Sequence, residues 1–84
     1  MSQSYEKINM SKPTVFQICI QGELDESWSE YFSAQSVSIE TDKTGNAVTV
    51  FMTEPMDQAA LVGLVNHLNA LGIPLISVEP FQVE

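Results

Sequence analysis

Apolar residues recur at intervals of three and four positions in one stretch of the chain, from residue 61 to residue 71. This spacing brings side chains onto one stripe of an α-helix, so it predicts a helix that turns that side towards a core. A helix of about four turns, roughly 22 Å long, accounts for the pattern. The stripe consists of Leu61, Leu64, Val65, Leu68 and Leu71.

Residues at both ends of this stretch carry the usual signals of helix termini. Asp57 is a suitable N-cap, because its carboxylate accepts a hydrogen bond from a backbone N–H that has no partner within the helix. Met56 and Leu61 have the spacing of a hydrophobic staple across that cap. Gly72 is expected to end the helix in a left-handed conformation, and Pro74 prevents its continuation.

The opposite side of the same helix is flat. Its four residues fall within roughly 60° of one another around the helix axis, and Gly63 lowers the helix propensity by about 1 kcal/mol. Two interpretations stay open: a solvated surface of small residues, or a close contact with another helix, within the fold or across a dimer. The residues are Ala59, Gly63, Asn66 and Ala70.

Two segments in the first half of the chain alternate between apolar and polar residues, which predicts half-buried β-strands. They span residues 14–21 and 36–41. The residues expected to face inward are Phe16, Ile18, Ile20, Val37 and Ile39.

A turn and two further strands are expected in the second half. Residues 42–46, DKTGN, contain a glycine and an asparagine that tolerate positive φ, which predicts a hairpin into a third strand closed by Pro55. Residues 75–79 form the fourth strand, and Pro80, which lacks a backbone N–H, places it at a sheet edge. The inward residues of these strands are Val48, Val50, Met52, Ile76 and Val78.

The segment between the first two strands has a second helical pattern. Three apolar residues at four-residue spacing predict a short helix of about two turns with an aromatic inner side. Ser27 and Glu30 have the spacing of a capping box, and Asp25 is a competing N-cap. The three apolar residues are Leu24, Trp28 and Phe32.

The order strand, helix, strand, strand, helix, strand predicts an α+β fold, the ferredoxin-like split βαβ sandwich (β-α-β-β-α-β). Its four antiparallel strands lie in the spatial order 4-1-3-2, and two helices cover one face through right-handed crossovers. The alternative is a three-stranded meander in which residues 23–33 form a loop that folds over the sheet. Residues 13–82 are expected to form a single domain, preceded by a disordered tail at residues 1–12, which lack an apolar period.

Two segments of the chain resemble a family of small, uncharacterised bacterial proteins. They are GELDESWSEYF at residues 22–32 and DQAALVGLVNHLNALGIPLISV at residues 57–78, and with the intervening strands the resemblance covers about residues 14–80. It supports the fold assignment and implies no activity, because that family has no established function. Val62 stands where its members commonly carry histidine, which argues against histidine chemistry at this position.

The chain of 84 residues carries 11 Asp and Glu against 3 Lys and Arg, a net charge of −8. This charge excludes nucleic-acid binding, because affinity for a phosphate backbone depends on Lys and Arg contacts. Anionic membrane surfaces are disfavoured for the same reason, and no apolar run approaches the roughly 20 residues of a membrane span. A lone cysteine and the lack of an export signal predict a cytoplasmic protein without disulfides.

Candidate catalytic groups are few. His67 is the only side chain whose ordinary titration range suits a base near neutral pH, and no second histidine exists to share a metal ion with it. Cys19 would need a base or a positive neighbour to become a nucleophile, and none is adjacent in the sequence. No catalytic motif or phosphate-binding loop occurs, so no cofactor and no metal site are expected.

The outer face of the sheet is the expected partner or ligand surface. We expect a non-catalytic binding or accessory module that acts there through protein–protein contact. The alternatives are a small-ligand-binding regulatory module of the ACT type, by analogy of fold alone, and a small enzyme that uses Cys19 or His67. The surface residues are Gln17, Cys19, Thr49, Phe51 and Ser77, with Leu75 at the margin.

A weak homodimer through this face is also expected. An exposed Phe51 on a solvated sheet face favours burial against a second copy. Added salt should strengthen the dimer, because it screens the repulsion between negatively charged copies.

Overall fold

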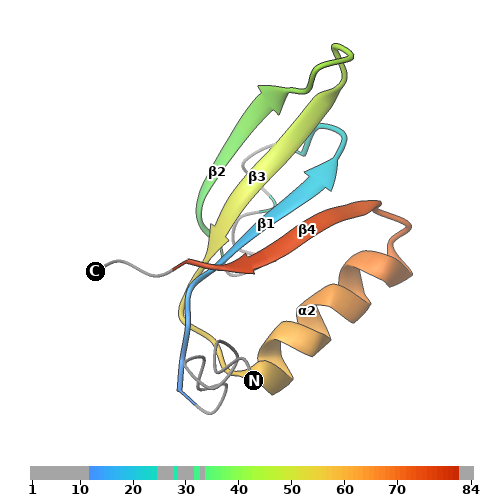
Figure 1. The fold of residues 1–84 in the computed structure, drawn as a ribbon. Helices are drawn as coiled ribbons and strands as arrows, with labels where there is room; N and C mark the ends of the chain where they lie inside the picture. Colours follow the sequence, from blue (N-terminus) through green and yellow to red (C-terminus); the bar gives the residue numbers. More distant parts are fainter. Residues whose placement is uncertain (1–11, 25–27, 29–31, 33, 82–84) are drawn as a thin grey trace, which may run out of the picture.

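The computed structural model describes residues 12–24, 28, 32 and 34–81. Its elements are β1 (Phe16–Gln21), β2 (Ala34–Thr41), β3 (Ala47–Thr53), α2 (Gln58–Ala70) and β4 (Leu75–Pro80). The strands form one antiparallel sheet in the order β2-β3-β1-β4, and α2 packs against one of its faces (Figure 1). This confirms the predicted spatial order of the strands and the place of β4 at an edge.

The predicted ferredoxin-like sandwich with two helices is wrong, because the described residues contain one helix, α2. After β1 the chain stays beside β3: the Gly22 N–H donates to a β3 carbonyl at 2.9 Å, and the Leu24 N–H donates to the Thr49 hydroxyl at 3.0 Å. β2 then begins earlier than predicted. Of the connection to β2, residues 25–27, 29–31 and 33 lie outside the described residues.

Aromatic side chains of this crossover cover the α2 side of the sheet. The Phe32 N–H donates to the Trp28 carbonyl at 3.0 Å. Phe32 is buried and stacks on Trp28 and on Phe51, with ring centroids 5.3 and 5.7 Å apart, respectively. The cap residues predicted at positions 25, 27 and 30 and the tail at residues 1–11 lie outside the described residues.

The termini of α2 are as predicted. Asp57 Oδ1 accepts a hydrogen bond from the Ala60 N–H at 2.9 Å, which confirms the N-cap. At the other end Gly72 has a φ of 74°, and the Ile73 N–H donates to the Leu68 carbonyl at 3.0 Å. Within the described part of the chain, no helix has the length and apolar character needed to cross a membrane.

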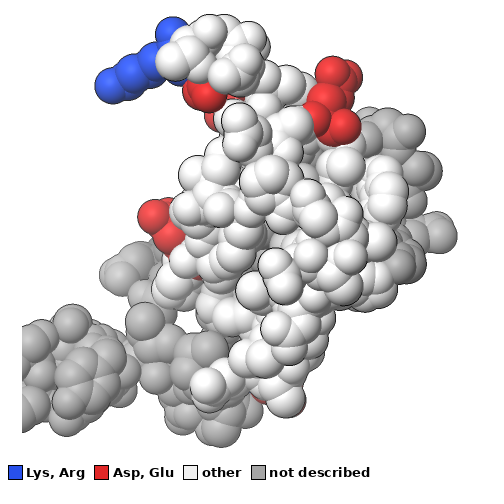
Figure 2. All heavy atoms as spheres, turned by 90° about the vertical axis from the view of Figure 1, so that its right-hand side faces the viewer, with Lys and Arg blue, Asp and Glu red and all other residues white. Residues whose placement is uncertain are grey.

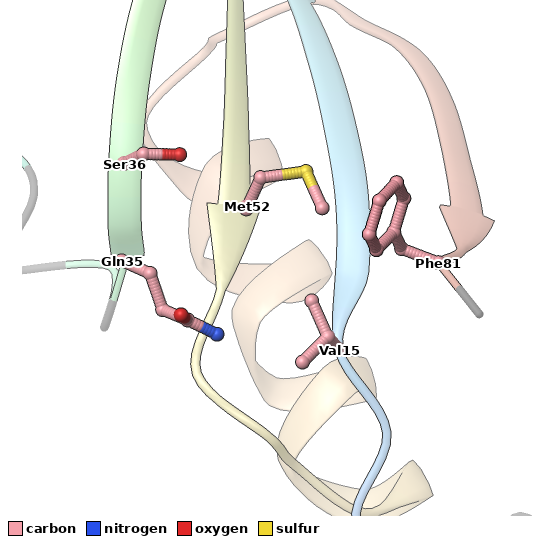
Figure 3. A pocket seen from close by; sticks show the side chains of 5 residues that line it. All are labelled: Val15, Gln35, Ser36, Met52 and Phe81. Atoms are coloured by element: carbon pink, nitrogen blue, oxygen red, sulfur yellow. The ribbon is translucent and has the colours of Figure 1, made fainter. Parts of the chain in front are cut away.

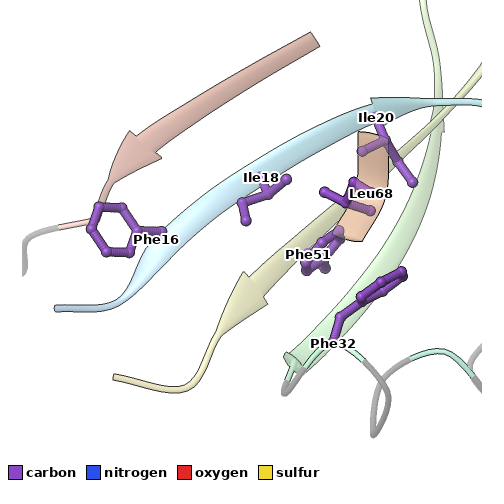
Figure 4. Packing of buried hydrophobic residues seen from close by; sticks show 6 residues of the cluster. All are labelled: Phe16, Ile18, Ile20, Phe32, Phe51 and Leu68. Atoms are coloured by element: carbon purple, nitrogen blue, oxygen red, sulfur yellow. The ribbon is translucent and has the colours of Figure 1, made fainter. Parts of the chain in front are cut away.

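The core lies between α2 and the sheet (Figure 4). Ile18, Ile20 and Leu68 are fully buried, which confirms the inward face of β1 and the rotation of α2. Leu64 is half-buried and packs against the core, whereas Leu71 is 44% exposed and falls outside it. The buried cluster consists of Phe16, Ile18, Ile20, Phe32, Phe51 and Leu68.

The orientation predicted for β3 is wrong. Its register pairs Phe51 with the buried Ile18, so Phe51 and the alternate residues of β3 face α2. Thr49 and Thr53 are each fully buried on this face. Three residues expected inward from their hydrophobicity lie on the outer face instead: Val48, Val50 and Met52.

Hydrogen bonds of two threonine hydroxyls explain this orientation. The Thr49 hydroxyl donates to the Gly22 carbonyl at 2.7 Å and accepts from the Leu24 N–H at 3.0 Å, just beyond one end of β1. The Thr53 hydroxyl accepts from the Phe16 N–H at 3.0 Å, at the other end. These contacts offset the desolvation of both hydroxyls. Among the described residues, no buried side-chain polar atom lacks a partner.

The predicted turn at residues 42–46 joins β2 to β3. The Asp42 carboxylate accepts hydrogen bonds from the Thr44 hydroxyl at 2.8 Å and from the Asn46 N–H at 2.9 Å. The Thr44 hydroxyl, followed by the Asn46 N–H, holds the pKa of Asp42 below its usual range. Gly45 has a φ of 89°, which glycine adopts without strain.

Thr49→Val should destabilise the protein by about 1–3 kcal/mol, because the Leu24 N–H and the Gly22 carbonyl lose their partner while side-chain volume is retained. Urea denaturation measures the change. Thr41→Val at the exposed end of β2 is the matched control and should change stability by less than about 0.5 kcal/mol. Equal effects of the two substitutions would contradict the role of the buried hydroxyl.

Leu68→Ala should destabilise the protein by about 2–5 kcal/mol, because it leaves a cavity at a fully buried position. Leu64→Ala should cost clearly less, since Leu64 is only half-buried and solvent can reach the vacated space. Thermal and urea melts of the two variants provide the comparison. A larger loss from Leu64→Ala would mean that α2 is rotated relative to the sheet.

Candidate functional site

The candidate site is the outer face of the sheet, on the side away from α2. Cys19 in β1 is in register with Ser77 of β4 on one side and with Val50 of β3 on the other. Gln17 is in register with Met52. Residues in register share a face, so Gln17 and Ser77 border an apolar strip of Cys19, Val50 and Met52, all of them half-buried.

Three of the five residues predicted for this face lie on it. Gln17, Cys19 and Ser77 are neighbours there. Thr49 and Phe51 lie on the α2 side, with exposed fractions of 0% and 2%. The apolar character of the outer face therefore comes from residues that the sequence assigns to the core.

A groove of about 510 Å³ opens at the end of this face where β1 and β2 begin (Figure 3). Val15, Met52 and Phe81 form its apolar walls, and Phe81 is 46% exposed. Gln35 and Ser36 of β2 line the other side and add polar groups. The result is an apolar hollow with polar groups along one rim.

Backbone contacts hold both sides of this groove in place. The Phe81 N–H donates to the Val15 carbonyl at 2.8 Å, which joins the two walls beyond the ends of β1 and β4. A register shift at the start of β2 leaves Gln35 as the extra residue of a β-bulge. Its Nε2 donates to the Thr53 carbonyl at 2.8 Å, so the Gln35 side chain is fixed across β3.

None of the five groove residues is a predicted site residue. Met52 is expected inward because of its hydrophobicity, and Phe81 follows Pro80, beyond the expected end of the last strand. A bulge such as that at Gln35 leaves no mark in the alternation of side chains. One feature of the sequence could have indicated the groove: Val15 and Phe81 are apolar, although they lie beside strand ends, where polar residues are usual.

The two candidate catalytic residues are separated by the sheet. Cys19 is a free, half-buried thiol on the outer face, next to Val50 and Ser77 in register. His67 lies on α2, on the other side, with its ring edge-on to Phe32 at a centroid distance of 6.3 Å. A nucleophile and its base must be within hydrogen-bonding reach, so these two residues cannot act as a pair. In the described ranges, no three His, Cys, Asp or Glu residues gather as metal ligands.

Acidic residues frame the outer face. Glu79 is in register with Gln17, and Glu40 is in register with a β3 residue of the same face. Lys12 and Lys43 are the cationic side chains of the described part of the chain. With a net charge of −8 for the whole chain, the field at this face is negative.

Over its described residues the protein is therefore a small α+β protein, with a helix on one face of a four-stranded antiparallel sheet and a groove on the other. Residues 15–79 match the model of a family described as a domain of unknown function (DUF8691), and the chain belongs to this family. The match includes both segments that carry the resemblance, residues 22–32 and 57–78. No curated protein and no solved structure shows significant similarity to the chain.

Proposed function

We propose that this protein is a non-catalytic binding or accessory module that acts through protein–protein contact at the outer face of its sheet. The supporting observation is the apolar groove of Val15, Met52 and Phe81, which is open to solvent. Covering such surface removes it from water and stabilises a complex. Methionine and aromatic side chains are also enriched in protein interfaces, and the flexible Met52 can adapt to a partner.

The charge of the protein indicates the chemistry of the partner. The groove receives an apolar side chain, while Glu79 and the net charge of −8 attract Lys or Arg residues beside it. The Gln35 amide already donates to the Thr53 carbonyl, so Ser36 is the rim residue that offers a hydroxyl to the partner. We therefore expect a segment with one large apolar residue flanked by positive charges.

A small apolar ligand is the second candidate occupant, because the volume of the groove lies in the range of roughly 300–1,000 Å³ that is usual for small-molecule sites. The ACT-type analogy no longer supports this candidate, since the ferredoxin-like fold is wrong. Protein contact is favoured because the groove continues into the strip of Cys19 and Val50 along the sheet. That surface is longer than a compact ligand covers.

A cytoplasmic location is part of the same proposal. Cys19 is the single cysteine of the chain and is unpaired. Free thiols persist in reducing compartments, and a binding surface that includes one is best suited to such a compartment.

Met52→Glu places a charge in the groove and should prevent partner binding while the protein stays folded, because Met52 is half-buried. The control is Ile39→Glu, at a residue of β2 that is 46% exposed on the α2 side of the sheet. Wild type and both variants are compared by affinity capture from the native cell with quantitative mass spectrometry. We expect proteins retained by wild type and the control to be depleted about tenfold or more with Met52→Glu.

A purified segment of the captured protein then tests the chemistry. Reversing its Lys and Arg residues to Glu should weaken binding, and added salt should weaken the wild-type complex. Equal capture by all three forms of the module would overturn the proposed function. A ligand adduct seen in native mass spectra of wild type and lost with Met52→Glu would establish the second candidate instead.

A further inference from the structure

A second hollow lies on the α2 side of the sheet, where α2 ends and β4 begins. Its volume is about 280 Å³. One side of it comes from α2, and the other side comes from the connection to β4 and the first residue of that strand. The residues that line it are Val65, Asn66, Asn69, Ile73, Pro74 and Leu75.

A β-bulge in β4 turns Leu75 towards this hollow. The pairing of β4 with β1 changes register between Ser77 and Leu75, which leaves Ile76 as the extra residue. Leu75 is therefore in register with the buried Ile20 and shares its face, the one against which α2 packs. Leu75 is nevertheless 40% exposed, so its side chain forms an apolar wall of the hollow that solvent reaches.

Backbone hydrogen bonds fix the connection that forms the apolar side of the hollow. The Ile73 N–H donates to the Leu68 carbonyl at 3.0 Å, which ties the connection to the end of α2. The Gln21 N–H donates to the Pro74 carbonyl at 2.9 Å, which ties it to β1. Ile73 is half-buried and packs against the core. The fold therefore forms this hollow before any ligand binds, as is usual for small-molecule sites.

Two asparagine amides form the polar side of the hollow. Asn66 and Asn69 are three positions apart on α2, so their side chains are neighbours on the helix surface. Both residues are exposed, and neither side chain makes a hydrogen bond within the described part of the chain. An amide side chain offers two N–H donors and one C=O acceptor. Two such amides side by side can therefore hold a group that both donates and accepts hydrogen bonds.

The surroundings of the hollow are uncharged. None of its lining residues carries a charge, and α2 contains no Asp, Glu, Lys or Arg over Gln58–Ala70. Figure 2 views the molecule from the side where α2 ends and β4 begins, and the charged residues visible there lie around an uncharged area. The net charge of −8 repels an anion, and a cation would lose hydration here without a carboxylate to pair with. These conditions favour a neutral ligand.

We propose that this hollow binds a small neutral ligand in which an apolar ring or chain carries a carboxamide or a similar hydrogen-bonding group. The apolar part contacts Val65, Ile73 and Leu75, and the carboxamide pairs with the amides of Asn66 and Asn69. The volume of about 280 Å³ exceeds the roughly 150 Å³ of an apolar cavity that takes up benzene, so a single ring with such a group fits. The groove of the proposed function lies on the other face of the sheet, so the two sites are independent.

Benzamide is the probe for this site, because it consists of one ring and one carboxamide. It is titrated into isotope-labelled protein while the backbone amide signals are followed by two-dimensional NMR. We expect saturable shifts at residues 65–75, and binding about fivefold or more weaker for benzoate, which has the same ring and a negative charge. No saturable shift up to the solubility limit of benzamide, or saturable shifts only elsewhere in the chain, would overturn the proposal and leave the proposed function untouched.

Two pairs of variants test the individual contacts. Asn69→Leu keeps the size of the side chain but removes its amide, so it should weaken benzamide binding about fivefold. Its control is Gln58→Leu, at an exposed amide about three turns away on α2, which should leave the affinity unchanged. Leu75→Ser should weaken binding by about the same factor through lost apolar contact, whereas Ile76→Ser at the bulge should not. Thermal melts verify that the variants are folded, and equal affinities within either pair would overturn the proposed contacts.

Discussion

Two buried threonine hydroxyls hold β3 against both ends of β1, and the composition of the two sheet faces follows from them. Thr49 binds backbone groups of Gly22 and Leu24, and Thr53 binds the Phe16 N–H. Shifting β3 by one residue would turn both hydroxyls to the outer face and leave three backbone groups without their hydrogen-bond partners. Each unpaired group would cost about 1–3 kcal/mol of stability. Burying Val50 or Met52 in their place would return about 1.5–3 kcal/mol for each side chain. These two contributions are of similar size, and the burial of Phe51, which stacks on Phe32 and would move to the outer face with such a shift, favours the observed register.

The outer face is apolar as a consequence of this register. With the threonines inside, Val50 and Met52 are left on the side that α2 does not cover. The bulge at Gln35 and the hydrogen bond between Phe81 and Val15 then shape one end of that face into a groove. The contacts that stabilise the core and those that create the candidate binding surface therefore belong to the same arrangement of strands.

The net charge of the chain bears on the proposed binding at the outer face. In the proposed complex, Glu79 and the net charge of −8 attract positive charges of the partner.

The sequence by itself determined the elements whose signals are local. Asp57 and Gly72 delimit α2, residues 42–46 form the turn, and the alternation in β1 identifies its buried face. These features depend on capping, on backbone conformation and on side-chain period, all set within a few residues. The predicted order of the strands is also correct, although it was taken from the ferredoxin-like fold, which is wrong.

Only the tertiary structure decided which face of β3 is buried and where the candidate groove forms. Alternation with a period of two shows which residues of a strand share a face. It does not show which face is buried when both faces carry apolar residues. The deciding hydrogen bonds join Thr49 to Leu24 and Gly22, which precede it in the chain by 25 and 27 positions, respectively. The groove combines β2, β3 and residues beside β1 and β4, so its members become neighbours only when the sheet forms.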